Sequence, residues 1–165
     1  MTPRCATSSS RAPFALCFHR AAMSQVAFYC LPAAVGLWFL PAPLRHLILY
    51  SSGLPFAETW RTPRAASKLR PNHDLLQRCE AVHANALEGL VMFFGSVLAA
   101  VVAGVPSEQV DTAAVTYVAS RVAYTAVYLA SSPKRRWLGP VRTLCFAAGF
   151  TPVLFLFFAA AARRA

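Results

Sequence analysis

The sequence predicts an all-α membrane protein, a bundle of four transmembrane helices, from three observations. Hydrophobic residues make up 57% of the chain and charged residues only 13%, whereas soluble domains carry about 25% charged residues. The mean hydropathy is +0.47. Apolar residues run on continuously instead of alternating. This pattern argues against a transmembrane β-barrel and leaves four stretches near the roughly 20 residues with which a helix crosses a bilayer.

The first predicted span covers residues 24–44, which carry no charged side chain. We expect Pro32 to kink this helix and Pro41 and Pro43 to bend or end it, because proline lacks a backbone N–H and clashes with the preceding turn. Residues 51–78 are polar and interrupted by prolines, so we predict a long, partly ordered loop.

The other three spans are predicted over residues 81–103, 110–130 and 141–162, each of which is mainly apolar. A short turn separates the first two of these spans, and Ser107 is the expected cap of the helix that follows it. The basic loop 131–140 separates the last two.

The distribution of positive charge predicts the topology. Five cations lie in loop 51–78 and three in loop 131–140, but the turn between the second and third spans carries none. By the positive-inside rule, the two basic loops lie on the cytoplasmic side and both termini on the other side. The basic ends of the chain weigh weakly against this topology.

Residues 1–23 are predicted to be an extension of a membrane domain that covers residues 24–162. The extension contains arginines and a run of serines but no acidic residue, a composition typical of an organellar transit peptide. A disordered tail, or a chain that starts at Met23, explains the same composition.

Metal, disulfide and nucleic-acid chemistry are not expected. The five cysteines form no CxxC pair and no metal-ligand spacing, and the four histidines are scattered. The formal net charge is +10, but the basic loops lack the interleaved aromatic residues of a nucleic-acid surface. The sequence contains no glycine-rich phosphate loop, zinc-protease motif or nucleophile elbow.

Two opposite charges stand inside predicted spans, Glu88 in the second and Arg121 in the third. A charge at the middle of a transmembrane helix costs roughly 2.5–3.5 kcal/mol on insertion scales, so such residues face the bundle interior and usually pair. We therefore expect Glu88 and Arg121 to form an ion pair between adjacent antiparallel helices.

Helical spacing places further polar residues beside this pair, since positions three, four or seven residues apart share one helix face. The predicted pocket opens toward the two basic loops, and its members are Arg78, Asn85, Glu88, Arg121, Tyr124, Tyr128 and Arg142. Arginines suit a ligand with more than one anionic group, the carboxylate suits an ammonium, and the amide and phenols donate and accept hydrogen bonds. The pocket therefore suits a small zwitterionic peptide with an additional carboxylate. Alternatively, Glu88 and Arg121 only fix the helix packing.

These residues resemble the motifs of one family. Residues 78–88, with Arg78, His83, Asn85 and Glu88, resemble the second-helix signature of the MAPEG family, the membrane-associated proteins in eicosanoid and glutathione metabolism. Residues 121–128, from Arg121 to Tyr128, resemble its third-helix motif. Residues 139–143, from Gly139 to Thr143, resemble the start of its fourth helix. The resemblance covers about residues 24–162.

The resemblance implies a four-helix membrane bundle that assembles as a homotrimer, in contact with membrane lipids. Glutathione, the implied co-substrate, would bind between subunits near the cytosolic face. An endoplasmic-reticulum-type membrane is favoured, while the acid-free N-terminus leaves a mitochondrial membrane open. Carried over by position, the glutathione contacts would be Arg78, Asn85, Glu88, Arg121, Tyr124, Tyr128 and Arg142.

The implied catalytic residues are Arg142 and Thr143, because a cation and a hydroxyl donor lower the pKa of a thiol and the thiolate is the nucleophile. The second substrate would be a small lipophilic electrophile or a lipid hydroperoxide. The sequence departs from the family at Ala81 and Ala84, where eicosanoid-type members carry arginines. Tyr124 also replaces a histidine found in some members.

Phe146 replaces a tyrosine that other members carry, and this set of departures fits small MAPEG-like proteins better than the eicosanoid enzymes. The leading interpretation is a glutathione transferase-like or peroxidase-like membrane enzyme without a metal. Two alternatives remain open at this point: a non-catalytic protein of the same fold with a structural Glu–Arg pair, and a small transport or channel component.

Overall fold

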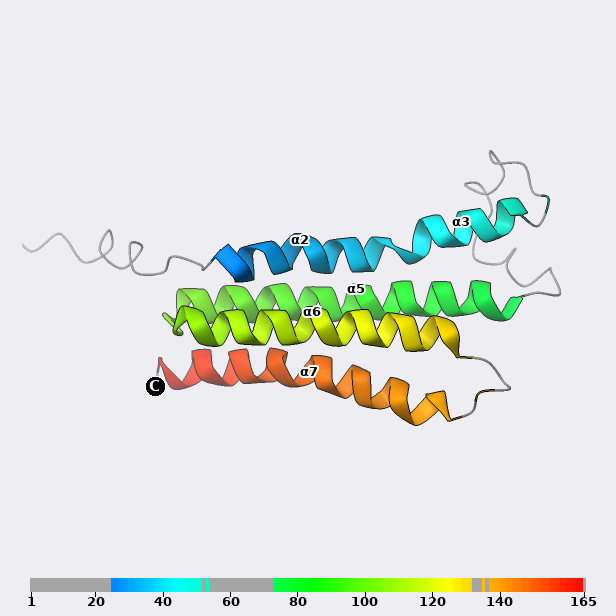
Figure 1. Cartoon of the computed structure of the whole chain (residues 1–165). Coiled ribbons are helices and arrows are strands. Elements are labelled where there is room, and N and C mark those ends of the chain that lie inside the picture. Colours follow the sequence, from blue (N-terminus) through cyan, green and yellow to red (C-terminus); the bar gives the residue numbers. More distant parts are fainter. Residues whose placement is uncertain (1–24, 52, 54–72, 132–134, 136, 165) are drawn as a thin grey trace, which may run out of the picture.

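The computed structural model describes residues 25–51, 53, 73–131, 135 and 137–164. Over these residues the chain forms helices joined by turns, and the helices lie side by side (Figure 1). Their bounds are Gln25–Phe39 for α2, Pro41–Ser51 for α3, His73–Val102 for α5, Ser107–Ala130 for α6 and Leu138–Ala162 for α7. Helices α5 and α6 contact each other and both outer helices, α2 and α7, which do not contact one another. The architecture is therefore a four-rod bundle with α3 continuing the α2 rod.

The first rod is interrupted at Leu40, between α2 and α3. Pro41 and Pro43 lack the N–H groups that would bond to the carbonyls one turn earlier. At this break the carbonyl oxygen of Trp38 lies 3.0 Å from Nδ1 of His83 on α5. The two side-chain rings also stack, with centroids 5.2 Å apart. The expected bend at the proline pair is thus present, but the helix continues to Ser51, beyond the predicted end at residue 44, and its interruption is not at Pro32.

Helix α5 begins at His73, so the prediction of a loop over residues 51–78 is wrong for its last six residues. Leu76, Cys79 and Val82 are buried, and this three-residue spacing is that of one helix face. The polar residues between them conceal the pattern in the sequence. Asp74 in the first turn also favours the helix start through the helix dipole.

Three of the four predicted spans are long and apolar enough to cross a membrane: residues 25–51, 74–102 and 138–162. Helix α6 falls outside this group, which departs from the prediction, although α6 lies along the full length of the bundle (Figure 1). The polar residues of α6 lower its hydropathy and so exclude it from the candidate spans. One polar residue, Asp111, has a clear structural role, because its carboxylate accepts a hydrogen bond of 3.0 Å from the backbone N–H of Ala27 in the first turn of α2.

The turn before α6 is built by Gly104, whose φ of 73° favours glycine. Pro106 precedes the first helical residue, and the helix has no side-chain cap. Ser107 is therefore not the cap that the sequence suggested. Arg163, just beyond α7, donates a hydrogen bond of 2.9 Å to the carbonyl oxygen of Gly104, which links the last helix to this turn.

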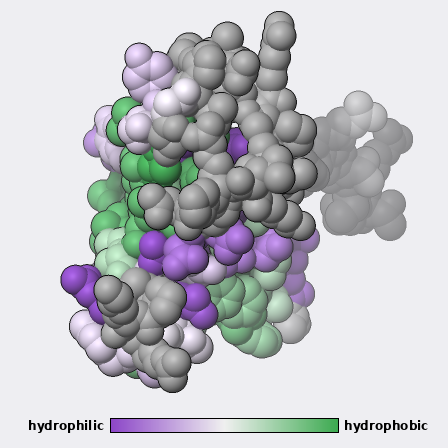
Figure 2. Space-filling view, turned by 90° about the vertical axis from the view of Figure 1, so that its right-hand side faces the viewer, coloured by the Kyte–Doolittle hydropathy of each residue, from purple (hydrophilic) through white to green (hydrophobic). Residues whose placement is uncertain are grey.

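The two basic loops attach at the same end of the bundle. The end of α3, the start of α5 and the α6–α7 connection all lie there, whereas Gln25, the Gly104 turn and the C-terminus lie at the opposite end (Figure 1). Figure 2 looks onto the loop end and shows hydrophilic residues gathered in a band with hydrophobic residues on both sides. The side of the membrane that each end faces stays a prediction.

The hydrophobic core fills the other half of the bundle. The rings of Phe93 on α5 and Tyr117 on α6 stack with centroids 4.1 Å apart. Small buried residues such as Ala27, Ala100 and Ala114 let the helices approach closely. This tightly packed half holds the helices in register, and the predicted site residues lie in the half nearer the loops.

Candidate functional site

Four of the predicted site residues form a continuous chain of contacts across three helices. Nδ2 of Asn85 on α5 donates a hydrogen bond of 2.7 Å to the hydroxyl oxygen of Tyr124 on α6. The Tyr124 ring lies 5.5 Å from that of Tyr128, centroid to centroid. On α7, Cζ of Arg142 lies 4.7 Å above the Tyr128 ring. We call these four residues the Asn85–Arg142 cluster.

Arg121 lies beside this cluster but is buried inside the bundle, with 5% of its surface exposed. Its Cζ atom lies 5.0 Å from the ring centroid of Tyr117, 5.0 Å from that of Phe146 and 5.9 Å from that of Tyr124. A cation over an aromatic face gains about 2 kcal/mol or more when both groups are out of water. Aromatic rings from α6 and α7 therefore surround the guanidinium.

Two glycines make room for the Arg121 guanidinium. A Cβ at Gly89 would lie 3.1 Å from Cζ of Arg121, and a Cβ at Gly149 would lie 3.1 Å from its Nε. Both distances are too short for ordinary contact, so the guanidinium occupies space that any side chain at these positions would take. Gly89 and Gly149 thus allow α5 and α7 to close around α6.

The predicted ion pair between Glu88 and Arg121 is absent from the described part of the chain. Glu88 is exposed, while Arg121 is buried. The residue of α5 that faces Arg121 is Gly89. Because one residue turns an α-helix by about 100°, Glu88 points away from Arg121, toward the outside of the single chain.

Two further predicted residues stay outside the cluster. Arg78 is half-buried one turn into α5, and its buried Nε has no hydrogen-bond partner among the described residues. Thr143 is exposed, and its hydroxyl donates a hydrogen bond of 3.2 Å to the carbonyl oxygen of Gly139 on its own helix. The structure thus brings together Asn85, Arg121, Tyr124, Tyr128 and Arg142, but not Arg78, Glu88 or Thr143.

The family model of the MAPEG family matches residues 26–162, which is most of the chain. The chain belongs to the MAPEG family. Together with its three long apolar helices, this membership makes it a multi-pass integral membrane protein. Neither the search of curated proteins nor the search of solved structures found a match.

Several residues around the site of this MAPEG protein escaped the sequence analysis. Tyr117 lies four residues before Arg121, so helical spacing could have placed it on the same face. Gly89 and Gly149 gave no such signal, because a glycine that accommodates another side chain looks like any other glycine in an apolar run. Phe146 was noted only for the tyrosine it replaces, although its ring contacts both Arg121 and Tyr124.

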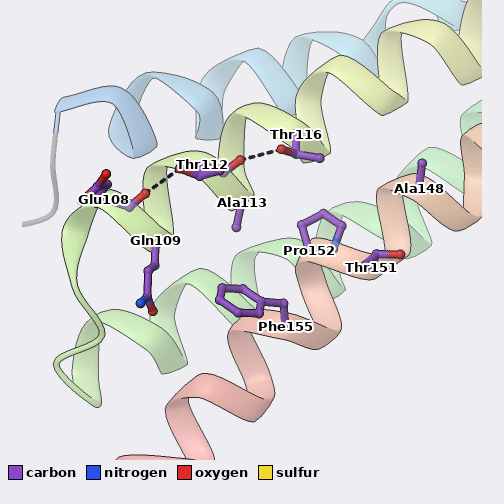
Figure 3. A pocket seen from close by; sticks show the side chains of 9 residues that line it. All are labelled: Glu108, Gln109, Thr112, Ala113, Thr116, Ala148, Thr151, Pro152 and Phe155. Atoms are coloured by element: carbon purple, nitrogen blue, oxygen red, sulfur yellow. Dashed lines mark hydrogen bonds between the residues drawn. The ribbon is translucent and has the colours of Figure 1, made fainter.

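A groove of about 760 Å³ lies between α6 and α7 toward the other end of the bundle (Figure 3). Its polar lining is largely engaged, because the hydroxyls of Thr112, Thr116 and Thr151 donate to backbone carbonyls of their own helices. None of the predicted site residues lines this groove. Among the described residues, no three His, Cys, Asp or Glu side chains come together as they would around a metal ion.

Proposed function

We propose that this protein binds glutathione at the Asn85–Arg142 cluster and adds the glutathione thiolate to lipophilic electrophiles. The observation that carries the proposal is the cluster itself. Arg142 lies over the ring of Tyr128, and the neighbouring Tyr124 accepts a hydrogen bond from Asn85. The cluster offers donors for anionic groups in a membrane protein of a glutathione-associated family. Glutathione is a co-substrate here, and the chemistry requires no metal.

Arg142 is the proposed catalytic cation. The residue is half-buried, and its guanidinium lies over the Tyr128 ring at the loop end of α7. A cation beside a thiol lowers the thiol pKa and so raises the share of the nucleophilic thiolate. Thr143 is the proposed second donor, and its hydroxyl must turn from the Gly139 carbonyl toward the sulfur to act.

The remaining predicted residues are proposed to bind glutathione without taking part in the chemistry. Asn85, Tyr124 and Tyr128 offer hydrogen bonds in the cluster, whereas Arg78 and Glu88 would contact a carboxylate and the ammonium group from farther out. Arg121 adds positive charge beneath the Tyr124 ring. An exposed Glu88 in a membrane span is expensive, which supports a homotrimer in which a second subunit covers this face of α5.

In the proposed reaction, the thiol gives up its proton to water and the thiolate sulfur forms a bond to an electrophilic carbon. In a substitution the leaving group departs with its bonding electron pair, whereas in an addition to a double bond a proton reaches the neighbouring carbon. Reduction of a lipid hydroperoxide is the related proposal. The thiolate attacks a peroxide oxygen, the O–O bond breaks to give a sulfenic acid and, after protonation, the lipid alcohol, and a second glutathione thiol then displaces water from the sulfenic acid to form the disulfide. An endoplasmic-reticulum-type membrane supplies such lipophilic substrates. The structural Glu–Arg alternative is not proposed, because Glu88 faces away from Arg121.

A conjugation assay on the purified protein in detergent tests the proposal, with a panel of lipophilic electrophiles and glutathione binding measured by calorimetry. We expect conjugation by the natural protein, and Arg142→Ala should lower kcat by about 10²-fold, as for a lost electrostatic donor. Arg135→Ala is the matched control, because Arg135 is exposed just before the same helix. Failure to bind glutathione would rule out the proposed function.

A further inference from the structure

The groove of about 760 Å³ between α6 and α7 has the depth of one membrane leaflet (Figure 3). Its lining starts at Glu108 in the first turn of α6 and reaches Thr116, eight residues farther along the helix. At 1.5 Å per residue, the groove is about 12 Å long. The hydrocarbon core of a bilayer is about 30 Å thick, so the groove extends from one end of the bundle nearly to the middle of the membrane.

The groove is open on the outer surface of the bundle. Ala148, Thr151 and Phe155 of α7, which line it, are all exposed, and α7 is long and apolar enough to cross a membrane. An unfilled groove would forfeit the packing contacts of its lining. Its occupant therefore comes from the surrounding bilayer and is either a lipid chain or another membrane-spanning helix.

The polarity of the groove changes along its length. Its inner part requires no hydrogen bonds, because its threonine hydroxyls donate to carbonyls of their own helices and because Pro152 and Phe155 are apolar. Its outer end carries the carboxylate of Glu108 and the amide of Gln109. Neither side chain has an ion pair or hydrogen bond within the described part of the chain. This order of groups matches a lipid, with its chain inside and its headgroup at the end.

The length of the groove distinguishes a lipid from a helix. A membrane-spanning helix of a second copy of the chain crosses both leaflets, so it would need a groove about twice as long. A single acyl chain reaches only from the headgroups to the middle of the bilayer, which is the depth that the groove covers. The length therefore favours a lipid chain.

The charges at this end of the bundle select the headgroup. The Glu108 carboxylate attracts a cationic group such as an ammonium. Arg163, just beyond α7, is exposed and bonded to the Gly104 carbonyl in the turn before α6, so a cation that suits a phosphate lies at the same end. Charges of both signs match a headgroup that contains both an ammonium and a phosphate.

We propose that the α6–α7 groove binds one acyl chain of a zwitterionic phospholipid, whose ammonium group pairs with Glu108. Packing inside a bilayer hardly distinguishes one apolar chain from another, so the headgroup provides the specificity. The site is separate from the Asn85–Arg142 cluster, none of whose residues lines the groove. The proposal does not depend on glutathione binding or catalysis.

Native mass spectrometry of the purified full-length protein tests the proposal, after release from nanodiscs that contain equal amounts of phosphatidylcholine and phosphatidylglycerol with the same acyl chains. Phosphatidylcholine should be retained roughly two- to fivefold more often, the range for an ion pair near the surface. Glu108→Gln keeps the size of the side chain but removes its charge, so it should abolish this preference. Asp74→Asn is the matched control at the loop end of the bundle, where Asp74 is also exposed, and should keep the preference.

A second pair of variants locates the acyl chain. Ala148→Trp fills the groove from α7 and should remove most of the retained phospholipid. Ala33→Trp places the same ring on the exposed surface of α2, outside the groove, and should leave the retained phospholipid unchanged. Should Ala148→Trp fail to fold, Glu108→Gln decides alone, because Glu108 is exposed and outside the core.

Two results would overturn the proposal. One is equal retention of the two headgroups by the natural protein. The other is unchanged lipid retention in Ala148→Trp. If this variant lost an oligomer in the same spectra instead of the lipid, the groove would be a contact with a second copy of the chain.

Discussion

At the scale of single residues, the position of a glycine determines where the buried arginine lies. Glu88 and Gly89 are neighbours in sequence, yet only Gly89 faces Arg121. Helical spacing correctly grouped Arg121 with Tyr124 and Tyr128 on α6. Helical spacing could not show whether Glu88 or Gly89 of α5 faces Arg121. The expectation of an ion pair favoured Glu88, but the guanidinium lies where Gly89 has no side chain.

Replacement of Gly149 by alanine tests this space. A Cβ there would lie 2.6 Å from Oγ of Ser120 and 3.1 Å from Nε of Arg121, so α7 or the guanidinium would have to move. We expect Gly149→Ala to lower the free energy of unfolding by about 1–3 kcal/mol, the usual cost of overpacking. Thermal unfolding in detergent measures the change.

Gly36→Ala is the matched control, because nothing lies within 4 Å of its added Cβ in α2. It should stabilise the protein by about 0.5–1 kcal/mol, as alanine does in a helix interior. Equal effects of the two substitutions would mean that Gly149 does not accommodate Arg121.

At the scale of helices, length and hydropathy located the four rods, three of which are long and apolar enough to cross a membrane. The helix ends, by contrast, depended on contacts made elsewhere in the chain. The interruption at Leu40 lies where His83 of α5 approaches the carbonyl of Trp38. The early start of α5 at His73 is stabilised by the burial of Leu76, Cys79 and Val82, which are separated by polar residues in the sequence. Neither contact leaves a trace in the local sequence. The polar character of α6 was visible, but the role of Asp111 in holding α2 was not.

Asp111 is expected to anchor the first turn of α2. Its carboxylate accepts the Ala27 N–H at 3.0 Å, and an N-terminal cap of this kind contributes about 0.5–2 kcal/mol. Asp111→Ala should therefore lower the free energy of unfolding by about 1–2 kcal/mol. Glu108→Ala removes an exposed carboxylate of the same helix and should have little effect. A similar loss of unfolding free energy in both variants would mean that the negative charge alone matters, and that Asp111 does not anchor α2.

At the scale of the whole molecule, the helix ends to which both basic loops attach lie at one end of the bundle, the end nearer the Asn85–Arg142 cluster. Large apolar side chains such as Phe28, Leu98 and Phe158 point outward from the bundle, as expected for helices that meet lipid. The loop charges predict that this end faces the cytoplasm. Glutathione dissolved in the cytosol would then reach Arg142 without crossing the membrane.

Cysteine labelling in sealed vesicles tests this orientation. Ser107 and Arg135 are exposed and lie at opposite ends of the bundle, so each can be replaced by cysteine in a variant without the five native cysteines. A membrane-impermeant reagent should label position 135 from the cytoplasmic face and position 107 from the other face. The reverse pattern would invert the topology.

The central claim is that Arg142 stabilises the thiolate of bound glutathione. The most direct measurement is the ultraviolet difference spectrum of thiolate formation when glutathione is added to the purified protein at neutral pH, without an electrophile. The natural protein should produce the thiolate band in proportion to the bound glutathione. Arg142→Ala should lose most of the band while still binding glutathione through the remaining contacts, and Arg135→Ala should retain it. An unchanged thiolate band in Arg142→Ala would contradict the account.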